Sequence, residues 1–588
     1  MIHTLSTRKK LWAAALAAVF ITAGCSSSSS SDAPPTTGDV TISHGTGSGN
    51  AAAHSSPQAA AAIPAATGSL QPQADFPDGV DSMQVEFRDS AGQLLYGPIE
   101  VPAAPQVTIN GVPLDASSVT VDYLRNGGYA LASDDEEIVW NDAVSSVSPV
   151  PAAVTPSTTQ WNSGMDAQGK ARLTVSVEGG PAQNFLTKGV GYSPAPIGFS
   201  NKNGPSFGDV FWDTPGEFLD FEKVWKRDLE TIRGHGINAV RTYSLIAHFI
   251  NDDGTIPDQA TINNPDSLRV REHKKFLDEA WNNGADPIYV IVGIPMPEVI
   301  FDKTYYDDPA NAREIEYWDN NFTATVTQMQ NHPAVLGFTI FNEIGGGADR
   351  YADNAAKAQH FWSQVQNYSE RAKRIAPHKL VGWAYFDDPQ FASKTLDYRR
   401  QYAKAIDFYG INAFQVEQLA TTLDPWKQSA QSDTARPILL TEYGLPTTIR
   451  DGGGNLPPIH STEASIKKTA EVVGKVIPQA FKHPVVAGMF YFEWSDEWWK
   501  QGGGSDIKQE GGARVDYFPQ QHWDEEGFGL YSIELGDRSA EQVYADAAWK
   551  KGSNVQVDKL TPKTELLDVV KDIYKNADQI REAALSQP

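Results

Sequence analysis

From about residue 158 onward, short apolar runs of strand length alternate with stretches in which apolar residues recur at helical spacing. The run 335–341 (VLGFTIF) is nearly continuous in apolar residues, which is typical of a strand that a parallel sheet buries on both faces. Seven other runs have a similar character. The eight predicted strands are 184–192, 237–243, 286–294, 335–343, 380–384, 406–414, 438–443 and 487–494.

Helical patterns separate several of these strands. After Thr214-Pro215, which suits the start of a helix, apolar residues recur with a helical period. The same period occurs over 466–477 and in a C-terminal segment, 561–577. This repeat predicts an α/β fold, a (β/α)8 (TIM) barrel that spans 158–588 and ends in a helix. In such a barrel the catalytic residues lie at the C-terminal ends of the strands.

A different pattern precedes the barrel. Short runs there alternate apolar and polar residues, as in 82–87 (SMQVEF) and 119–123 (VTVDY), and tight turns such as Asn110-Gly111 separate them. We expect a small all-β sandwich domain at 75–157. Its sequence shows no chemistry and leaves a spacer role and a carbohydrate-binding role both open.

Residues 25–74 are rich in Ser, Ala, Pro, Gly and Thr and contain almost no large apolar residues. Such a segment cannot bury enough apolar surface to offset the entropy that is lost on folding. We therefore predict a disordered tether that precedes the sandwich.

The first 24 residues have the layout of a targeting segment. A stretch of three basic residues precedes an apolar run of 13 residues, which is too short to span a bilayer comfortably. The run leads into 21–25 (ITAGC), which resembles the lipobox of bacterial lipoproteins. The resemblance implies a signal peptide at 1–24, lipidation of Cys25 and a place in the bacterial cell envelope, at the outer membrane or on the periplasmic face. An ordinary secretory signal that is cut nearby is the alternative.

Composition narrows the chemistry further. A single cysteine excludes a disulfide framework, a thiolate metal cluster and a CxxC redox pair, and the 12 histidines show no ligand spacing such as HExxH. We expect neither a metal nor another cofactor. Removal of 1–24, which holds three basic residues and no acid, changes the formal net charge from −25 to −28. That balance excludes nucleic acid as a partner and favours a neutral or cationic substrate, and nothing implies a protein partner.

Carboxylates stand at the ends of two predicted strands. Asn342 and Glu343 close the fourth strand, and Glu442 lies at the end of the seventh, 99 positions after Glu343. A carboxylate beside a buried strand is costly unless it has a partner or a function. Because strand ends converge in a barrel, two carboxyl groups can meet across its mouth. The retaining hydrolysis of glycosides requires such a pair, with a separation of roughly 5–5.5 Å.

This arrangement resembles clan A of the glycoside hydrolases, whose acid/base Glu follows an Asn at strand four and whose nucleophilic Glu ends strand seven. The resemblance implies that Glu343 is the acid/base, that Glu442 is the nucleophile and that Asn342 binds the 2-hydroxyl of the sugar. It also implies that Arg241, at the end of the second strand, hydrogen-bonds the nucleophile. Trp494, at the end of the eighth strand, matches the aromatic residue that floors the subsite of cleavage.

Longer stretches resemble the β-1,3-glucanosyltransferases of fungal cell walls, notably 237–243 (INAVRTY) and 406–412 (IDFYGIN). The fungal enzymes have a Tyr where Phe414 stands. The hydroxyl that would touch the nucleophile is therefore missing here or comes from elsewhere, from Tyr443 or Tyr409.

The end of the barrel, 490–500, instead resembles bacterial barrel domains of the β-galactosidase and β-mannosidase family. Trp498 and Trp499 are adjacent there and cannot both lie on one face of a strand or helix, so at least one faces the cleft or solvent. Trp498 is the candidate for stacking on a sugar ring. Tyr243 and Tyr443, at the ends of the second and seventh strands, are further candidates for contact with the substrate.

We therefore expect a retaining glycosidase that cleaves or transglycosylates β-linked oligo- or polysaccharides, with β-1,3-glucan favoured by the strand motifs. Two alternatives stay open. One is an exo-acting enzyme of the β-mannosidase or β-galactosidase kind, and the other is a non-catalytic, glycan-binding surface lipoprotein.

If Cys25 carries a lipid, Cys25→Ala should move the protein from the membrane fraction to the soluble fraction of cells that express the full chain. Immunoblots of the two fractions measure the change. Ser26→Ala, one residue later, is the matched control and should stay with the membrane. Unchanged membrane retention of Cys25→Ala would count against lipidation.

Overall fold

The chain divides between Pro156 and Ser157 into two compact units. The computed structural model describes residues 37–43, 80, 82–90, 94–104, 106–124, 130–141, 144–147, 152–153, 159–199, 208–212, 222–245, 274–343, 354–387, 395–427, 435–450, 459–500, 509–535, 542 and 558–586.

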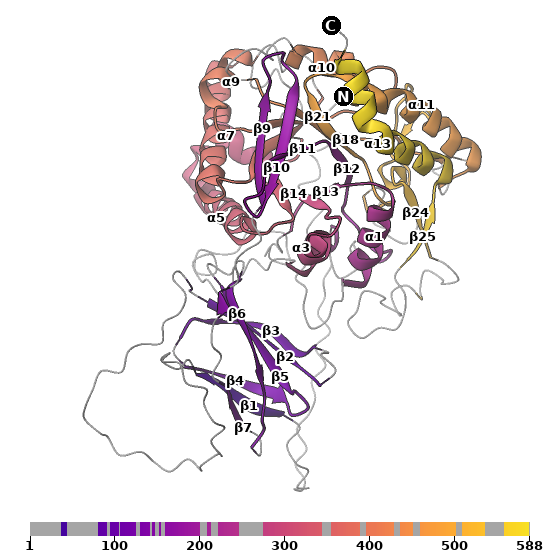
Figure 1. The fold of residues 1–588 in the computed structure, drawn as a ribbon. Helices are drawn as coiled ribbons and strands as arrows, with labels where there is room; N and C mark the ends of the chain where they lie inside the picture. Colours follow the sequence, from indigo (N-terminus) through magenta and orange to yellow (C-terminus); the bar gives the residue numbers. More distant parts are fainter. Residues whose placement is uncertain are drawn as a thin grey trace. The chain divides into compact units, whose positions relative to one another are not determined.

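The N-terminal unit is the all-β sandwich that the sequence predicts (Figure 1). One sheet has the strand order β4-β1-β7 and the other β3-β2-β5-β6-β8. Apolar residues alternate along β2 and β5, so that Met83 lies opposite Tyr123 and Val85 opposite Val121, all fully buried. The strands are β1 (Thr37–Ser43), β2 (Ser82–Arg88), β3 (Leu94–Pro102), β4 (Gln106–Pro113), β5 (Ser118–Leu124), β6 (Ala130–Glu137), β7 (Val144–Val147) and β8 (Ala152–Ala153).

The prediction of a tether over the whole of 25–74 is wrong at β1, because Thr37–Ser43 is a strand of the sandwich. Val40 and Ile42 are two residues apart and point into the core, where both are fully buried. Two apolar side chains are enough for a strand that is paired on both edges. Averaged over fifty residues of Ser, Ala and Pro, they left no visible signal. Cys25 and 1–24 lie outside the described residues.

The second unit contains a closed barrel of eight parallel strands, in the order in which they occur along the chain. All eight predicted strands are present, which confirms the (β/α)8 barrel. They are β12 (Thr187–Gly191), β13 (Ala239–Arg241), β14 (Tyr289–Gly293), β15 (Val335–Thr339), β16 (Leu380–Phe386), β17 (Phe408–Asn412), β18 (Ile438–Tyr443) and β21 (Val486–Tyr491).

Helices surround the barrel, with α5 and α7 on one flank and α11 and α13 on another in the view of Figure 1. The longer helices each bury an apolar stripe, as α1 does with Val224, Trp225, Leu229 and Ile232. The predicted start of the last helix at 561 is wrong, because Lys559–Pro562 pairs as strand β25 before the helix begins. The helices are α1 (Glu222–Gly234), α3 (Lys274–Trp281), α5 (Ala312–Met329), α7 (Ala355–Ile375), α9 (Leu396–Tyr402), α10 (Ala420–Lys427), α11 (Glu463–Lys482) and α13 (Thr564–Leu585).

Shorter elements occupy the connections. They are η2 (Val210–Trp212), η3 (Asn282–Gly284), η4 (Glu298–Phe301), α4 (Lys303–Tyr306), η5 (Pro309–Asn311), β19 (Thr448–Ile449), β20 (His460–Ser461), β22 (Ala513–Arg514), β23 (His522–Trp523), η6 (Glu525–Gly527), β24 (Tyr531–Glu534) and β25 (Lys559–Pro562).

A three-stranded antiparallel sheet that the sequence did not predict closes the N-terminal end of the barrel. It consists of β9 (Thr159–Met165), β10 (Ala171–Val177) and β11 (Gln183–Phe185), so the start of the predicted strand 184–192 belongs to this sheet instead. Its backbone bonds to residues that precede barrel strands, with Trp161 N–H donating to His378 O at 2.9 Å. Trp161 shares a buried cluster with inward-facing residues of seven barrel strands. The opposite end is left for the site.

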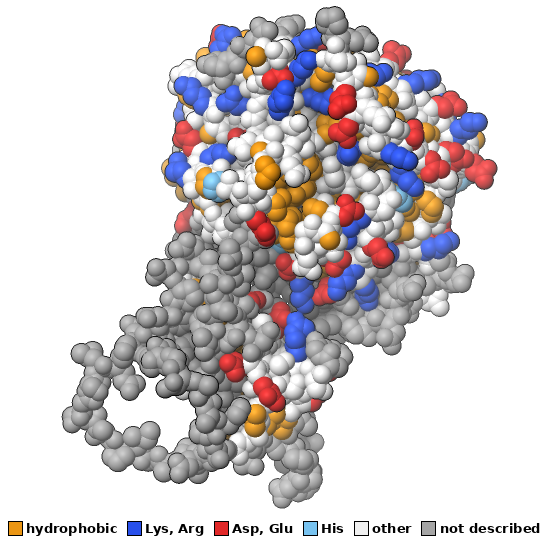
Figure 2. Space-filling model, viewed as in Figure 1, with side chains coloured by type: hydrophobic (Ala, Val, Ile, Leu, Met, Phe, Trp, Pro, Cys, Tyr) orange, Lys and Arg blue, Asp and Glu red, His pale blue; other side chains and the backbone are white. Residues whose placement is uncertain are grey.

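In the part of the chain that the structure describes, no helix is long and apolar enough to cross a membrane. On the face of the barrel unit in view, acidic and basic side chains are intermingled rather than gathered by sign (Figure 2).

Trp161→Ala should lower the free energy of unfolding by about 3–5 kcal/mol, because Trp161 fills the bottom of the barrel against Phe185 and Tyr289. Val177→Ala is the matched control: it removes apolar atoms from the same sheet, but Val177 is 37% exposed, so the change should stay within about 0.5 kcal/mol. Denaturant unfolding of the full chain measures both. Equal effects would show that the sheet is not part of the barrel core.

Candidate active site

Polar residues from four strands meet at the C-terminal edge of the barrel. Arg241 ends β13, Asn342 and Glu343 follow β15, Asn412 ends β17, and Glu442 is the penultimate residue of β18. The strands are parallel and closed into a ring, so their C-terminal ends share one edge. The predicted strand 335–343 stops at Thr339, and this places Asn342 and Glu343 in the connection, free of the ladder.

Glu442 is held by two donors at one of its oxygens. Arg241 Nη1 donates to Glu442 Oε1 at 2.6 Å, and Tyr243 Oη donates to the same atom at 2.8 Å. Arg241 and Glu442 are 1% and 4% exposed, so this is a buried, charge-assisted pair. Glu442 Oε2 has no hydrogen-bond partner in the described part of the chain. Oε1 is therefore held in place by two donors, whereas Oε2 is available to react.

A line of hydrogen bonds connects Glu442 to Glu343. Arg241 Nη2 donates to Asn342 Oδ1 at 2.7 Å, and Asn412 Nδ2 donates to Asn342 Oδ1 and to Glu343 Oε1, each at 3.1 Å. Asn412 is itself oriented by Thr441 Oγ1, which donates to Asn412 Oδ1 at 2.7 Å. The oxygen of the Asn342 amide is therefore occupied. Its NH2 group, on an exposed side chain, is the part that can donate to a ligand.

Glu343 is half-buried and its environment disfavours the charged form. Burial and then the negative charge of Glu442 raise the pKa of Glu343 to about 7, against the hydrogen bond from Asn412. Its backbone φ is +53°, a left-handed conformation that costs about 1–3 kcal/mol for a residue other than glycine and that clusters at functional sites. The amide N–H of Glu343 donates to Ala384 O at 2.9 Å, which holds the residue in this conformation.

The structure brings together the predicted residues Arg241, Asn342, Glu343, Glu442 and Tyr243. Tyr243 also supplies the hydroxyl that a Phe at 414 cannot.

Tyr443 does not face the substrate side, and its predicted role is wrong. Successive side chains of a strand point to opposite faces, so Tyr443 points outward where Glu442 points inward. Tyr443 is fully buried in the outer core, and its hydroxyl has no hydrogen-bond partner in the described ranges. Burial raises the pKa of Tyr443 well above its usual value. Tyr409, the other candidate for the missing hydroxyl, is 1% exposed and stacks on Trp383.

Trp494 is also a core residue rather than a floor for a sugar. It is 1% exposed, and its ring centroid lies 4.6 Å from that of Tyr531 and 6.1 Å from that of His235. The residue before it, Glu493, lies next to Tyr243 instead. Sequence alignment to a strand end does not show which of two neighbouring residues turns inward. Trp498 is half-buried against the outer core, and its contact with a sugar stays a prediction.

Asn412 was not predicted from the sequence; it ends the observed strand β17 but lies two residues before the end of the predicted strand 406–414. Glu493 and Glu497, in the segment 490–500, are a further pair of acids that the structure buries, with Ser193 and Lys500 as their partners.

Glu525 gave no sequence signal, because it lies in a connection after the barrel. Trp523 Nε1 donates to Glu525 Oε1 at 3.0 Å. The charge of Glu525 contributes to raising the pKa of both Glu343 and Lys500.

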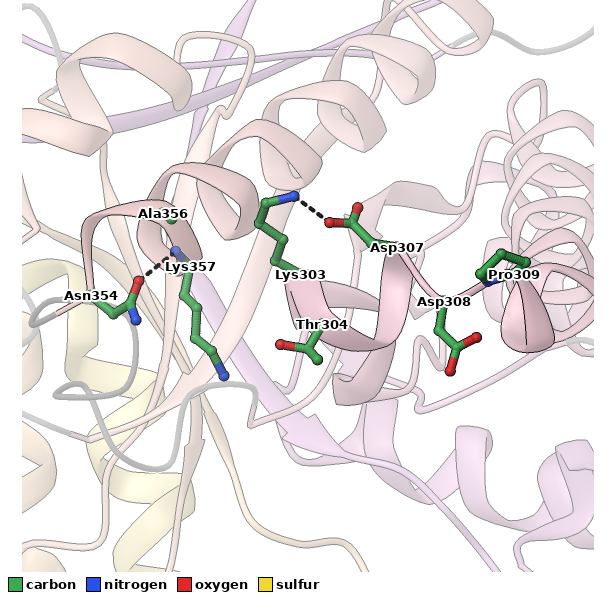
Figure 3. Close-up of a pocket in the computed structure, with 8 residues that line it drawn as sticks. All are labelled: Lys303, Thr304, Asp307, Asp308, Pro309, Asn354, Ala356 and Lys357. Atoms are coloured by element: carbon green, nitrogen blue, oxygen red, sulfur yellow. Dashed lines mark hydrogen bonds and ion pairs between the residues drawn. The ribbon is translucent and has the colours of Figure 1, made fainter.

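A separate shallow hollow of about 600 Å³ lies between α4 and the start of α7 (Figure 3). Its charged groups have partners. Lys303 pairs with Asp307, and Lys357 Nζ lies 2.9 Å from Asp302 Oδ2. No residue that lines it belongs to the line from Glu442 to Glu343, so it is not part of the site. Within the described ranges no group of three or more His, Cys, Asp and Glu side chains is placed to hold a metal.

The family described as glucanosyltransferases matches residues 269–452, which is less than half of the chain. The matched segment contains Glu343, Asn412 and Glu442 but neither Arg241 nor the end of the eighth strand. The resemblance to glucanosyltransferases is thereby confirmed over this part of the chain. No curated protein sequence matches the chain.

Among solved structures, three β-glucuronidases are similar. That of Ruminococcus gnavus is 13% identical (85% of this chain covered), that of Lactobacillus rhamnosus 15% (85%) and that of Dictyoglomus thermophilum 14% (84%). Each alignment has a TM-score of 0.41. The chain spans 64% of the length of each of these proteins.

Glu442→Gln should lower the pKa of Glu343 below about 7. The change keeps the size of the side chain but removes the negative charge that opposes ionisation of Glu343. Carbon-detected NMR of glutamate-labelled protein, titrated with pH, measures the shift. Glu582→Gln, on the exposed face of α13, is the control and should leave that pKa unchanged. A pKa that does not fall in Glu442→Gln would mean that the two carboxyl groups are not electrostatically coupled.

Proposed function

We propose that this chain is a retaining glycosidase, or a transglycosidase, that acts on β-linked glycans. The observation that carries the proposal is the hydrogen-bonded line that joins two carboxyl groups of different character, Glu442 and Glu343. Glu442 accepts hydrogen bonds from the Arg241 guanidinium and the Tyr243 hydroxyl on a single oxygen, Oε1. Glu343 has a pKa of about 7 and so still carries a proton near neutral pH.

Each group then has a role in a double displacement. Glu442 Oε2 attacks the anomeric carbon while Glu343 gives its proton to the glycosidic oxygen, so that the C–O bond breaks and a glycosyl-enzyme forms. Glu343, now ionised, takes a proton from the incoming water or sugar hydroxyl, which displaces Glu442 and restores both groups. Arg241 and Tyr243 orient the nucleophile. The free NH2 of Asn342 donates to the 2-hydroxyl of the sugar.

The strand motifs and the match to glucanosyltransferases favour β-1,3-glucan as the glycan. If a sugar hydroxyl reaches the glycosyl-enzyme before water does, the same site transfers rather than hydrolyses. We also propose that the chain is held at the bacterial cell envelope through Cys25, on the strength of the lipobox-like segment.

Glu442→Gln and Glu343→Ala should each reduce cleavage of β-1,3-gluco-oligosaccharides by orders of magnitude, on the order of 10²–10⁴-fold for the acid/base residue. Azide should partly restore only Glu343→Ala, because azide needs no general base to attack the glycosyl-enzyme, and the product should be a β-glycosyl azide. Chromatography of the products measures both. Glu582→Gln is the carboxylate-to-amide control and should keep full activity. Full activity in Glu442→Gln would sink the assignment.

A further inference from the structure

A buried polar cluster, defined by Ser193, Glu493, Glu497 and Lys500, lies just beyond the ends of β12 and β21. Ser193 Oγ donates to Glu493 Oε2 at 3.3 Å and also to Glu497 Oε1, and Lys500 Nζ forms an ion pair with Glu497 Oε2. Glu493 and Glu497 are each 1% exposed, whereas the Lys500 side chain is 18% exposed. Glu493 Oε1 is buried and accepts no hydrogen bond within the described ranges. Lys500 is therefore the member of the cluster that reaches solvent.

The cluster adjoins the nucleophile through Tyr243. A Cβ atom built on Gly191 would lie 3.6 Å from Tyr243 Oη and 3.6 Å from Glu493 Cβ, so only the missing side chain of Gly191 separates these two groups. Lys500 Nζ lies 4.6 Å from the ring centroid of Phe492 and 5.7 Å from that of Tyr243. Since Tyr243 Oη bonds to Glu442, Lys500 borders the space that a sugar attached to Glu442 would occupy.

The two acids of the cluster differ in their partners. The Ser193 hydroxyl lies within hydrogen-bond distance of both, but the ion pair with Lys500 belongs to Glu497. Burial together with the charge of Glu497 raises the pKa of Glu493 well above its usual value, whereas the charge of Lys500 opposes the effect of burial on the pKa of Glu497. Glu493 is therefore the acid that holds a proton more readily, and Glu497 is the ion-pair partner of Lys500. Burial lowers the pKa of Lys500, but the charges of Glu497, Glu493 and Glu525 outweigh this and raise it, so Lys500 keeps its proton.

Both cations beside Tyr243, Arg241 and Lys500, are thus already paired with an acid. Glu525 adds a further negative charge that acts on Glu343. An anionic sugar in this space would meet the negative charge of Glu442, and the two described cations beside Tyr243 would both already be occupied. A neutral sugar meets no such penalty, because an ammonium group has three N–H donors and can give one to a hydroxyl while it stays bonded to Glu497.

We propose that Lys500 is a specificity-determining residue of the subsite next to Glu442, and that its ion pair with Glu497 restricts that subsite to sugars without a carboxylate. The inference deepens the proposed function and rests on it. It identifies the substrate class as a neutral β-glycan, and it places the selecting charge in the segment after the eighth strand, outside the segment 269–452.

The test compares two probes that differ only at C6: β-1,3-gluco-oligosaccharides, and the β-1,3-glucuronic oligosaccharides of equal length made by oxidising C6. Wild type should prefer the neutral probe in kcat/KM by a factor on the order of 10². Glu493→Gln/Glu497→Gln removes both acids and frees Lys500, and should shift the ratio at least tenfold toward the oxidised probe (about 1.4 kcal/mol,). Glu497→Gln alone should shift it less, because Glu493 can then ionise.

Lys500→Gln removes the cation and keeps both acids, so it tests the role of Lys500 itself. It should raise KM for the neutral probe with kcat largely kept, and it should not improve cleavage of the oxidised probe. Glu222→Gln removes a carboxylate from a surface ion pair with Lys226 on α1 and should leave the ratio unchanged. Thermal melts check that each variant is folded, and if the double variant is not, the wild-type preference and Lys500→Gln decide.

Equal kcat/KM for the two probes in wild type would overturn the inference while leaving a glycosidase, as would an unchanged ratio in a folded double variant. If wild type cleaves neither probe, the proposed activity on β-1,3-glycans fails. Calorimetric titration of wild type with the same two probes then decides the preference separately, and tighter binding of the oxidised probe, or equal binding, would overturn it.

Discussion

Arg241 is the group on which the site depends. Its two terminal nitrogens bind different partners, Glu442 through Nη1 and Asn342 through Nη2, and it is itself almost completely buried. A guanidinium has the rigid fork that such double contact needs, and a Lys at this position would reach only one partner. Arg241 ends strand two and binds residues at the ends of strands four and seven. It therefore fixes the positions of the polar groups that barrel closure brings together.

Different partners give the two carboxyl groups different characters. Glu442 has a cation within hydrogen-bond distance, whereas among the described side chains Glu343 accepts from the amide of Asn412 and faces the charge of Glu442. The difference in their donors, rather than any difference in side chain, decides which carboxyl holds a proton. The same logic recurs after strand eight, where Glu497 forms an ion pair with Lys500 and burial raises the pKa of Glu493.

The barrel and its two principal carboxylates could be predicted because the apolar runs repeat along the chain and the carboxylates stand at the ends of two of them. Eight apolar runs predict eight strands, and a strand end predicts a position at the barrel mouth, so Glu343, Glu442 and Arg241 were found. The sequence did not predict which side chains at a strand end turn inward. Tyr443 and Trp494 each lie one residue from an inward-facing acid, and both are buried in the core outside the strands. Contacts that join residues far apart in sequence, such as Asn412 with Glu343, leave no local pattern, and neither does a short strand such as β1 within a polar segment.

The pairing of β12 with β21 sets Gly189 beside Phe490, so the first and last strands of the ring are separated by nearly the whole barrel sequence. Ser193 belongs to one side of this seam, and Glu493, Glu497 and Lys500 belong to the other. Loop closure over such a distance is a late and slow event in folding. A chain whose ring is still open has its acid, its nucleophile and its arginine, but lacks the wall that limits what enters. Selectivity therefore depends on the pairing of β12 with β21 that closes the ring.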